Sequence, residues 1–221
     1  MAIFAKDNFT DTNGTAITSH TPDIGGSWTN HASFGNNFAT IQSNKFQGTG
    51  VGLTAYYCNA TPGGADYTVA IDQTGGEQGS GTTNGQGPMG RIDTAAITGY
   101  WARYSPNNGG WQLFKSVAGT STQLGATQTA TLTASQVYHL VLSMVGTTIS
   151  MIVDGTTLVS VTDSSISAAG KAGIRSAQLN TGTYLLDNFV ATDTTSSGGP
   201  FPFFTRQAMS GGFREMAGGL I

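Results

Sequence analysis

The carboxylates are the residues in this chain best suited to catalysis, and their spacing argues against hydrolysis of a polysaccharide. A retaining glycosidase needs two carboxyl groups about 5 to 5.5 Å apart, one as the acid and one as the nucleophile. The 221-residue chain has only two glutamates, Glu77 in a glycine-rich stretch and Glu215 near its end. No two aspartates are spaced by two or four residues on a convincing strand; Asp7 and Asp11 come nearest, but they flank a short strand at its ends. We therefore expect no catalytic residues and no enzymatic activity.

Three other patterns that could do chemistry are incomplete. The string GQGPMG at 85–90 has the glycine spacing of a dinucleotide-binding turn, but no strong strand precedes it and Pro88 interrupts it, so we expect a surface loop. The three histidines are scattered, with His139 predicted to face away from the core. Cys58 is the only cysteine, which excludes an intramolecular disulfide and argues against a zinc site. No G-x-S-x-G nucleophile elbow is present.

Aromatic side chains that could stack on a sugar gather in one part of the chain. One face of each strand in a sandwich must fill the core, so packing is the alternative role for most of these rings. The weak carbohydrate-binding candidates, on two strands predicted to be adjacent, are Trp101, Trp111, Tyr100 and Tyr104.

Strand signals are clearest in the second half of the chain. Alternating apolar residues place Leu140 and Leu142 on one face of a strand, and Asp154-Gly155 is the strongest hairpin signal. We expect strands over 99–104, 110–116, 137–145, 148–153, 156–162, 171–175 and 184–191. The predicted core comprises Leu140, Leu142, Ile149, Met151, Val153, Leu158, Ile174 and Phe189.

The first half of the chain carries weaker strand signals, and a glycine-rich loop is expected over 73–90. Short strand candidates lie near 8–10, 28, 38–41, 51–57 and 67–71. Many short strands at close spacing predict an all-β fold, a two-sheet antiparallel jelly-roll sandwich with an extended C-terminal tail. We place the sandwich domain at 1–196 and the tail at 197–221.

Six short segments open and close the predicted domain. They are DNFTD (7–11), GGSW (25–28), YWAR (100–103), WQLFK (111–115), VDG (153–155) and LDNF (186–189). Together they resemble concanavalin A-like jelly-roll modules of the laminin G and pentraxin type, of the kind found in bacteriophage structural proteins. The resemblance spans 1–195, and its turn and core signatures specify a fold much better than a function.

The resemblance implies two further functions. Glucanases of this superfamily commonly carry two glutamates two to four residues apart on one strand, which this chain lacks, so a polysaccharide hydrolase is the least favoured alternative. Laminin G and pentraxin relatives often bind calcium at a loop rim. By that likeness the weak calcium candidates are Asp66, Asp72, Asp163 and Asn180, with the capping of turns as their alternative role. No other cofactor is expected.

The composition limits the partners. Charged residues make up only 10% of the chain, the net charge is −3 and no basic run occurs, which argues against nucleic acid as a partner. No apolar run approaches a membrane span and the N-terminal segment lacks a signal-peptide core, so we expect neither membrane association nor secretion. A Thr-, Ser-, Gly- and Asn-rich surface on a chain made in a host cytoplasm suits a virion component released by lysis.

The last 25 residues combine phenylalanines with glycine and proline and are too short to bury their own aromatic rings. Ordering a residue costs about 1 to 2 kcal/mol, so a docked tail needs substantial apolar burial. We expect the tail to dock on a neighbouring chain, with folding back on its own domain as the alternative. The predicted partner-binding residues are Phe201, Phe203, Phe204, Arg206, Phe213, Arg214, Leu220 and Ile221.

These observations predict a non-enzymatic virion structural protein, a head or tail decoration or a fibre subunit. Its tail would anchor it, and its jelly-roll domain would be displayed with weak glycan binding. The expected partners are other virion proteins (major capsid, portal, tail or fibre proteins), further copies of the chain in a multi-copy assembly, and a host surface glycan. The alternative is a free, lectin-like carbohydrate-binding module.

Overall fold

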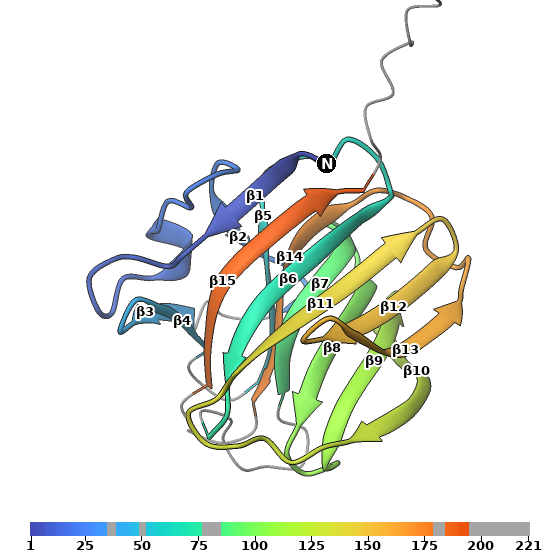
Figure 1. The fold of residues 1–221 in the computed structure, drawn as a ribbon. Coiled ribbons are helices and arrows are strands. Elements are labelled where there is room, and N and C mark those ends of the chain that lie inside the picture. Colours follow the sequence, from blue (N-terminus) through green and yellow to red (C-terminus); the bar gives the residue numbers. More distant parts are fainter. Residues whose placement is uncertain (35–38, 49–51, 77–84, 179–183, 195–221) are drawn as a thin grey trace, which may run out of the picture.

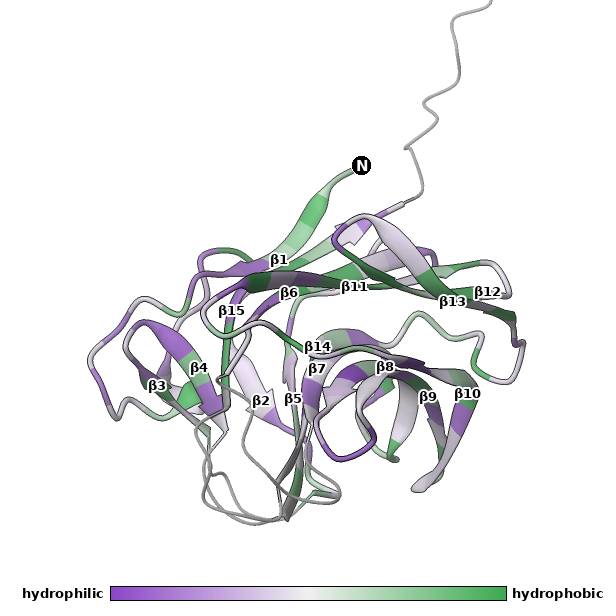
Figure 2. Cartoon of the chain, turned by 60° about the horizontal axis from the view of Figure 1, so that its bottom comes forward, coloured by the Kyte–Doolittle hydropathy of each residue, from purple (hydrophilic) through white to green (hydrophobic). Residues whose placement is uncertain are grey.

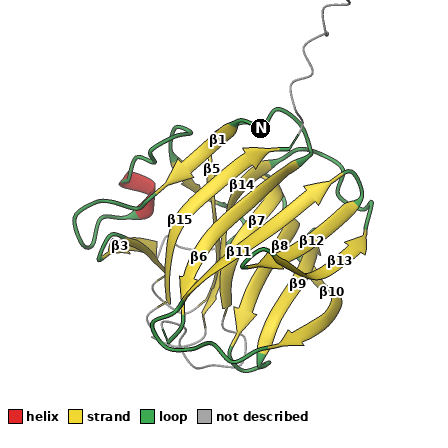
Figure 3. Ribbon diagram, viewed as in Figure 1, coloured by secondary structure: helices red, strands yellow, loops and turns green. Residues whose placement is uncertain are grey.

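The computed structural model describes residues 1–34, 39–48, 52–76, 85–178 and 184–194, which form an all-β domain (Figure 1). Its one helical element is a short 3-10 turn, η1 (Ile17–Ser19), shown in red in Figure 3. No helix in this described part of the chain is long and apolar enough to cross a membrane. The strands are β1 (Ile3–Asp7), β2 (Trp28–Asn30), β3 (Ala39–Gln42), β4 (Lys45–Gly48), β5 (Gly52–Cys58), β6 (Tyr67–Thr74), β7 (Gly85–Asp93), β8 (Thr98–Ser105), β9 (Gly110–Val117), β10 (Thr120–Thr129), β11 (Val137–Val145), β12 (Thr148–Val153), β13 (Thr156–Thr162), β14 (Lys171–Gln178) and β15 (Tyr184–Asp193).

The strands form two antiparallel sheets. Sheet A has the order β13-β12-β11-β6-β15-β4-β3, with β1 paired to β15, and sheet B has the order β10-β9-β8-β7-β14-β5-β2. Strands from the end of the chain lie inside each sheet, because β15 pairs with β4 and β6 while β14 pairs with β5 and β7. Figure 2 shows the two sheets as stacked layers. This confirms the predicted two-sheet sandwich.

The core lies between the inner faces of the sheets, where the alternation of the strands directs apolar side chains inward. The predicted core residues are buried there, except Leu158, which is half-buried and packs against the same cluster. Burial of each such side chain contributes about 1.5 to 3 kcal/mol. His139 faces outward, as predicted, with half of its side chain exposed.

The predicted hairpin at Asp154-Gly155 joins β12 to β13. Both residues have left-handed backbones, with φ of +49° and +79°, which is the twist that a two-residue turn between antiparallel strands requires. The turn at Gly146-Thr147 joins β11 to β12, and there only Gly146 has a left-handed backbone, with a φ of +55°.

Two expectations about the path of the chain are wrong. Residues 85–90, expected in a surface loop, begin the buried strand β7 in the middle of sheet B. Glycine serves close packing there, because a Cβ at Gly87 would lie 2.0 Å from the carbonyl oxygen of Ala102. The strand expected near 8–10 lies earlier in the chain, so that Asp7 ends β1 and Asp11 lies beyond it.

Candidate functional site

A tight turn between β7 and β8 forms one wall of a cavity at the end of the sandwich. Asp93, the last residue of β7, accepts hydrogen bonds at Oδ1 from the backbone N–H groups of Ala95 (2.8 Å) and Ala96 (3.2 Å). Aspartate favours turns because its side chain can cap backbone donors in this way. From the other side, His31 Nε2 lies 2.7 Å from the carbonyl oxygen of Asp93 and 3.1 Å from that of Ala96. These contacts fix the direction of the Asp93 carboxylate.

Arg91 holds together the loops on the other side of the cavity. Its side chain is buried and its backbone has a φ of +49°. The guanidinium also lies 3.6 Å from the carboxylate of Asp66. It donates hydrogen bonds to the carbonyl oxygens of Ala65 (2.9 Å), Ile166 (2.7 Å) and Gly146 (2.9 Å), which belong to three different loops. Because its donors are directed at protein carbonyls, Arg91 shapes the cavity more than it serves a ligand.

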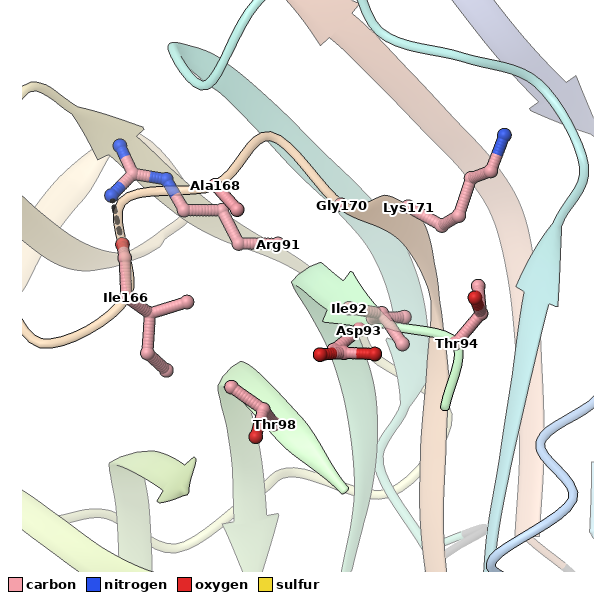
Figure 4. Close-up of a pocket in the computed structure, with 9 residues that line it drawn as sticks. All are labelled: Arg91, Ile92, Asp93, Thr94, Thr98, Ile166, Ala168, Gly170 and Lys171. Carbon is pink, nitrogen blue, oxygen red and sulfur yellow. Dashed lines mark hydrogen bonds between the residues drawn. The ribbon is translucent and has the colours of Figure 1, made fainter. Parts of the chain in front are cut away.

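The cavity has a volume of about 290 Å³. Figure 4 shows the Asp93 carboxylate between Ile92 and Thr98, while the ammonium of Lys171 points away from it. Lys171 Nζ instead donates to the carbonyl oxygen of Asn59 at 2.9 Å. The lining residues are Arg91, Ile92, Asp93, Thr94, Thr98, Ile166, Ala168, Gly170 and Lys171. The cavity therefore combines a carboxylate and two threonines with apolar side chains.

The polar groups of the cavity suit binding to hydroxyl groups. Within the described residues, no hydrogen bond reaches Asp93 Oδ2 or the Thr94 hydroxyl. Thr98 Oγ1 accepts a hydrogen bond from the backbone N–H of Ala118 at 3.1 Å, which leaves its own proton free to be donated. A carboxylate accepts only and a hydroxyl both donates and accepts, so a neutral polyol can satisfy this set. Among the described lining residues, none is a nucleophile paired with a base.

The structure separates the four aromatic candidates for sugar binding. Tyr100, Tyr104 and Trp111 point into the core and are at most 7% exposed, so they offer no surface for stacking on a sugar. Trp101 lies on the opposite face of sheet B, which we call the outer face, where it is 3% exposed within a second buried cluster and its ring stacks on Phe114 with centroids 4.5 Å apart. Neighbouring residues of a strand point to opposite faces, and that alternation divides the group.

The calcium candidates are not brought together. Asp66 accepts a hydrogen bond from the backbone of Gly146 at the cavity rim, and Asp72 lies in β6 with His139 Nδ1 at 2.6 Å. Asp163 follows β13. In the described part of the chain no group of three or more His, Cys, Asp or Glu side chains could hold a metal ion. Asn180 lies outside the described residues, and so do the eight tail residues from Phe201 to Ile221.

Asp163 belongs to a hydrogen-bonded cluster that closes one end of the sandwich. It accepts hydrogen bonds from Tyr100 Oη (2.6 Å), Lys115 Nζ (2.5 Å) and the hydroxyl of Ser165. Burial works against the charge, but these donors outweigh it and hold the pKa of Asp163 well below its usual range. Burial and the nearby carboxylate raise the pKa of Tyr100 to about 12. The cluster has the character of a structural clamp.

Sequence spacing missed one close pair of carboxyl groups. Asp72 and Asp187 are opposite one another in the neighbouring strands β6 and β15, although they are far apart in the chain. Burial raises the pKa of Asp187, and the adjacent charge of Asp72 acts in the same direction. Asp72 is in turn held by Asn188 Nδ2 at 2.8 Å. Neither residue is among those that line the cavity beside Asp93.

No protein-family model matches the chain, and no curated protein matches it either. Solved structures are similar to it. The carbohydrate binding module CBM66 from Bacillus subtilis has a TM-score of 0.62 at 21% identity, covering 75% of this chain and 95% of that one. A protein from Bacillus subtilis with a galectin-like fold has a TM-score of 0.59 at 12% identity, covering 87% and 96%. The exoplasmic/lumenal domain of VIP36, in its Ca²⁺/Man3GlcNAc-bound form, has a TM-score of 0.57 at 8% identity, covering 78% and 86%. These likenesses show the fold.

The polar residues of the cavity carry no sequence motif that could have identified them. Asp93, Thr94 and Thr98 have the residue types of an ordinary turn. The strand before them, β7, was predicted as a loop because of its glycines. A strand assignment for 85–93 would have placed Asp93 at a strand end, where binding residues often lie.

Proposed function

We propose that this chain is a non-catalytic carbohydrate-binding module that holds one sugar ring in the cavity beside Asp93. The free carboxylate oxygen of Asp93 would accept hydrogen bonds from two neighbouring sugar hydroxyls. Thr94 and Thr98 would complete the polar contacts, and Ile92 and Ile166 would contact the C–H groups of the ring. Ligand cavities usually measure about 300 to 1,000 Å³, so a cavity at the lower limit suits a single sugar unit.

The fixed direction of the Asp93 carboxylate is the observation on which this proposal depends. Its Oδ1 is occupied by two backbone N–H groups and its carbonyl oxygen contacts the ring of His31, so the free Oδ2 has little room to rotate. A polar group that is ordered before binding loses less entropy when the ligand arrives. The names of the similar structures add support, because they include a carbohydrate binding module and a domain bound to Man3GlcNAc.

The test is glycan binding by the wild-type protein and by Asp93→Asn. A glycan array identifies ligands, and calorimetry then measures the dissociation constant for the best of them. The asparagine oxygen can still cap the turn, so the fold is retained while the charged acceptor is lost. Hydrogen bonds to charged groups contribute about 1.5 to 3 kcal/mol, which predicts affinity that is weaker by about ten-fold or more.

Asp154→Asn is the matched control, because Asp154 also caps a backbone N–H through Oδ1, that of His139 at 2.8 Å, but lies in the β12–β13 hairpin. It should bind glycans as the wild type does. Wild-type affinity in Asp93→Asn would show that the cavity is not the binding site. A wild-type protein that binds no glycan on the array would refute the proposed function.

The expectation of a virion protein anchored by its tail stays a prediction. No virion protein is among the similar structures named above, and the tail lies outside the described residues, so we place glycan binding first. In a virion, the same module would be displayed on other virion proteins in several copies and would contact a host surface glycan. Calcium binding and the absence of enzymatic activity are likewise proposals.

A further inference from the structure

The outer face of sheet B carries a cluster of stacked cations and rings that lies outside the proposed sugar cavity. It comprises Phe34, Trp101, Arg103, Phe114 and Arg175, and we call it the arginine–aromatic cluster. The Arg175 guanidinium lies 4.2 Å from the ring centroid of Trp101 and 5.4 Å from that of Phe34. The Arg103 guanidinium lies 5.2 Å from Trp101 and 5.0 Å from Phe114.

Both arginines are buried and close enough to influence each other. Arg175 is 3% exposed and Arg103 is 8% exposed. Burial lowers the pKa of each guanidinium to about 10, and the charge of Arg103 contributes to the shift of Arg175. At neutral pH both therefore remain positively charged. Two like charges taken out of water are destabilising unless an anion or a set of acceptors compensates them.

The protein compensates Arg175 only in part. Its guanidinium donates to two hydroxyl oxygens, Ser116 Oγ at 2.5 Å and Ser121 Oγ at 3.3 Å. Its Nε is buried without a hydrogen-bond partner, and so is Nε1 of Trp101 on the same face. None of the ion pairs formed by the described residues includes Arg175. Arg175 and Trp101 thus present more donors than the described residues supply with acceptors, and a buried donor without an acceptor is costly.

We infer that the arginine–aromatic cluster binds the anionic group of an acidic saccharide. Guanidinium is planar and presents paired donors that match a carboxylate or a sulfate. Trp101 and Phe34 are buried beneath the guanidinium groups, so the half-exposed Phe114 is the ring that can contact the C–H face of a sugar and is where the ligand should gain access. The inference rests on the proposed function only in taking the anion to be carried by a sugar.

The cluster selects charge, whereas the Asp93 cavity selects hydroxyl groups. Arg103 supports this role because its Nε donates to Gln112 Oε1 at 3.0 Å, and Gln112 is itself held by Thr127 at 3.0 Å. This amide network fixes the guanidinium over the rings. A carboxylate or a sulfate would meet donors that are already in place.

The experiment measures tryptophan fluorescence and calorimetric binding of the full chain with trigalacturonate. A sulfated trisaccharide and a neutral galactose trisaccharide are run beside it, and all solutions have matched sodium chloride. We expect binding of one acidic ligand, at least ten-fold tighter than that of the neutral one and weakened by added salt. The two acidic arms distinguish a carboxylate from a sulfate ester as the source of the anion.

Arg175→Met should lower the affinity for the acidic ligand at least ten-fold. Arg175→Lys keeps the charge without the paired donors, so its affinity should lie between those of the wild type and Arg175→Met. The control is Lys6→Gln on β1, which removes one positive charge from sheet A and should leave the affinity for the acidic ligand unchanged. Trp101→Phe should abolish the fluorescence change, which keeps the test valid even where Arg175→Met fails to fold. Asp93→Asn should bind the acidic trisaccharide as the wild type does. Loss of glycan binding at the Asp93 cavity can then be distinguished from loss of binding at the arginine–aromatic cluster.

Three results would overturn the inference. Equal binding of acidic and neutral trisaccharides would remove the role of charge. A response to inorganic sulfate equal to that of the saccharides would show an adventitious ion only. No response to any acidic saccharide would leave the arginines with a packing role alone.

Discussion

Replacement of His20 by alanine should destabilise the domain and change how its stability depends on pH. His20 joins two carboxylates near the N-terminus: its Nε2 lies 3.0 Å from Asp7 Oδ1 and its Nδ1 lies 2.9 Å from Asp11 Oδ2. Asp7 is 1% exposed and also accepts hydrogen bonds from Trp28 Nε1 (2.5 Å) and from the backbone N–H of Phe9 (2.7 Å). Without the imidazole, a buried carboxylate loses one of its three partners.

The expected loss of unfolding free energy is about 2 to 4 kcal/mol. One charge-assisted hydrogen bond contributes about 1.5 to 3 kcal/mol, and removal of one partner from a buried ion pair costs about 3 to 5 kcal/mol when nothing else compensates. Two remaining donors compensate Asp7 in part, which places the value below that upper limit. The bond to Asp11 is only partly buried, so its loss should cost less than the loss of the bond to Asp7.

The sign of the pH dependence follows from the direction of the pKa shift. Burial opposes the charged imidazole, but the hydrogen bonds and charges of Asp11 and Asp7 outweigh it, and the pKa of His20 is raised above its ordinary 6.5. The contribution of His20 is therefore fully present below pH 6.5 and is lost as the pH rises through the raised value. The hydrogen bond to His20 lowers the pKa of Asp11, whose contribution is lost only as the pH falls below 3.8.

Urea unfolding at pH 5.5, 7 and 9 measures this prediction on the wild type and on His20→Ala. The stability difference between them should be largest at pH 5.5 and should narrow at pH 9. His139→Ala is the control, since His139 pairs with Asp72 on an exposed face and such pairs contribute about 1 kcal/mol or less. A difference that does not vary with pH, or a His20→Ala protein as stable as the wild type, would refute the role of this bridge.

Four further predictions concern the core, the clamp, the sites and the tail. Leu142→Ala should cost about 2 to 5 kcal/mol in urea unfolding, and wild-type stability would contradict its 0% exposure. Tyr100→Phe should cost about 1 to 2 kcal/mol and raise the pH of acid unfolding, because Asp163 loses a donor to its carboxylate. His31→Ala should weaken ligand binding at both proposed sites in calorimetry, and a loss at neither would contradict its positioning role. Truncation after Ser197 should leave a sandwich with the wild-type melting temperature that no longer joins an assembly, and wild-type occupancy would show that the tail is no anchor.

Most strands and turns of the sandwich could be predicted from residues that are neighbours in the sequence. The Asp154-Gly155 turn and the alternation around Leu142 depend on neighbours in the chain, so each could be predicted directly. Strand β7 could not, because its glycines are selected by the close approach of other strands. At Gly85 a Cβ would lie 2.8 Å from the carbonyl oxygen of Tyr104, which is a contact that only the assembled sheet creates.

The candidate sites were less accessible to prediction than the fold. The cavity combines a turn after β7 with the loop before β14, and Arg91 holds carbonyl oxygens from three loops that share no sequence pattern. The aromatic candidates were hard to place for a different reason. A ring in a strand can point to either face, and the alternation that places Tyr100 between the sheets places Trp101 in a second buried cluster on the outer face of sheet B.

One short segment connects the two proposed sites. After β2, the backbone N–H of His31 bonds to the carbonyl of Ala55 in β5, while its ring contacts the carbonyl oxygens of the Asp93 turn. Three residues later, Phe34 packs its ring edge-on against His31 at 5.5 Å and lies beneath the Arg175 guanidinium. A shift of His31 must therefore change both the direction of the Asp93 carboxylate and the support of Arg175. Sites are held most precisely where they are built on rigid elements, and this segment is anchored on the paired strands of sheet B, so one set of backbone contacts would order both proposed sites.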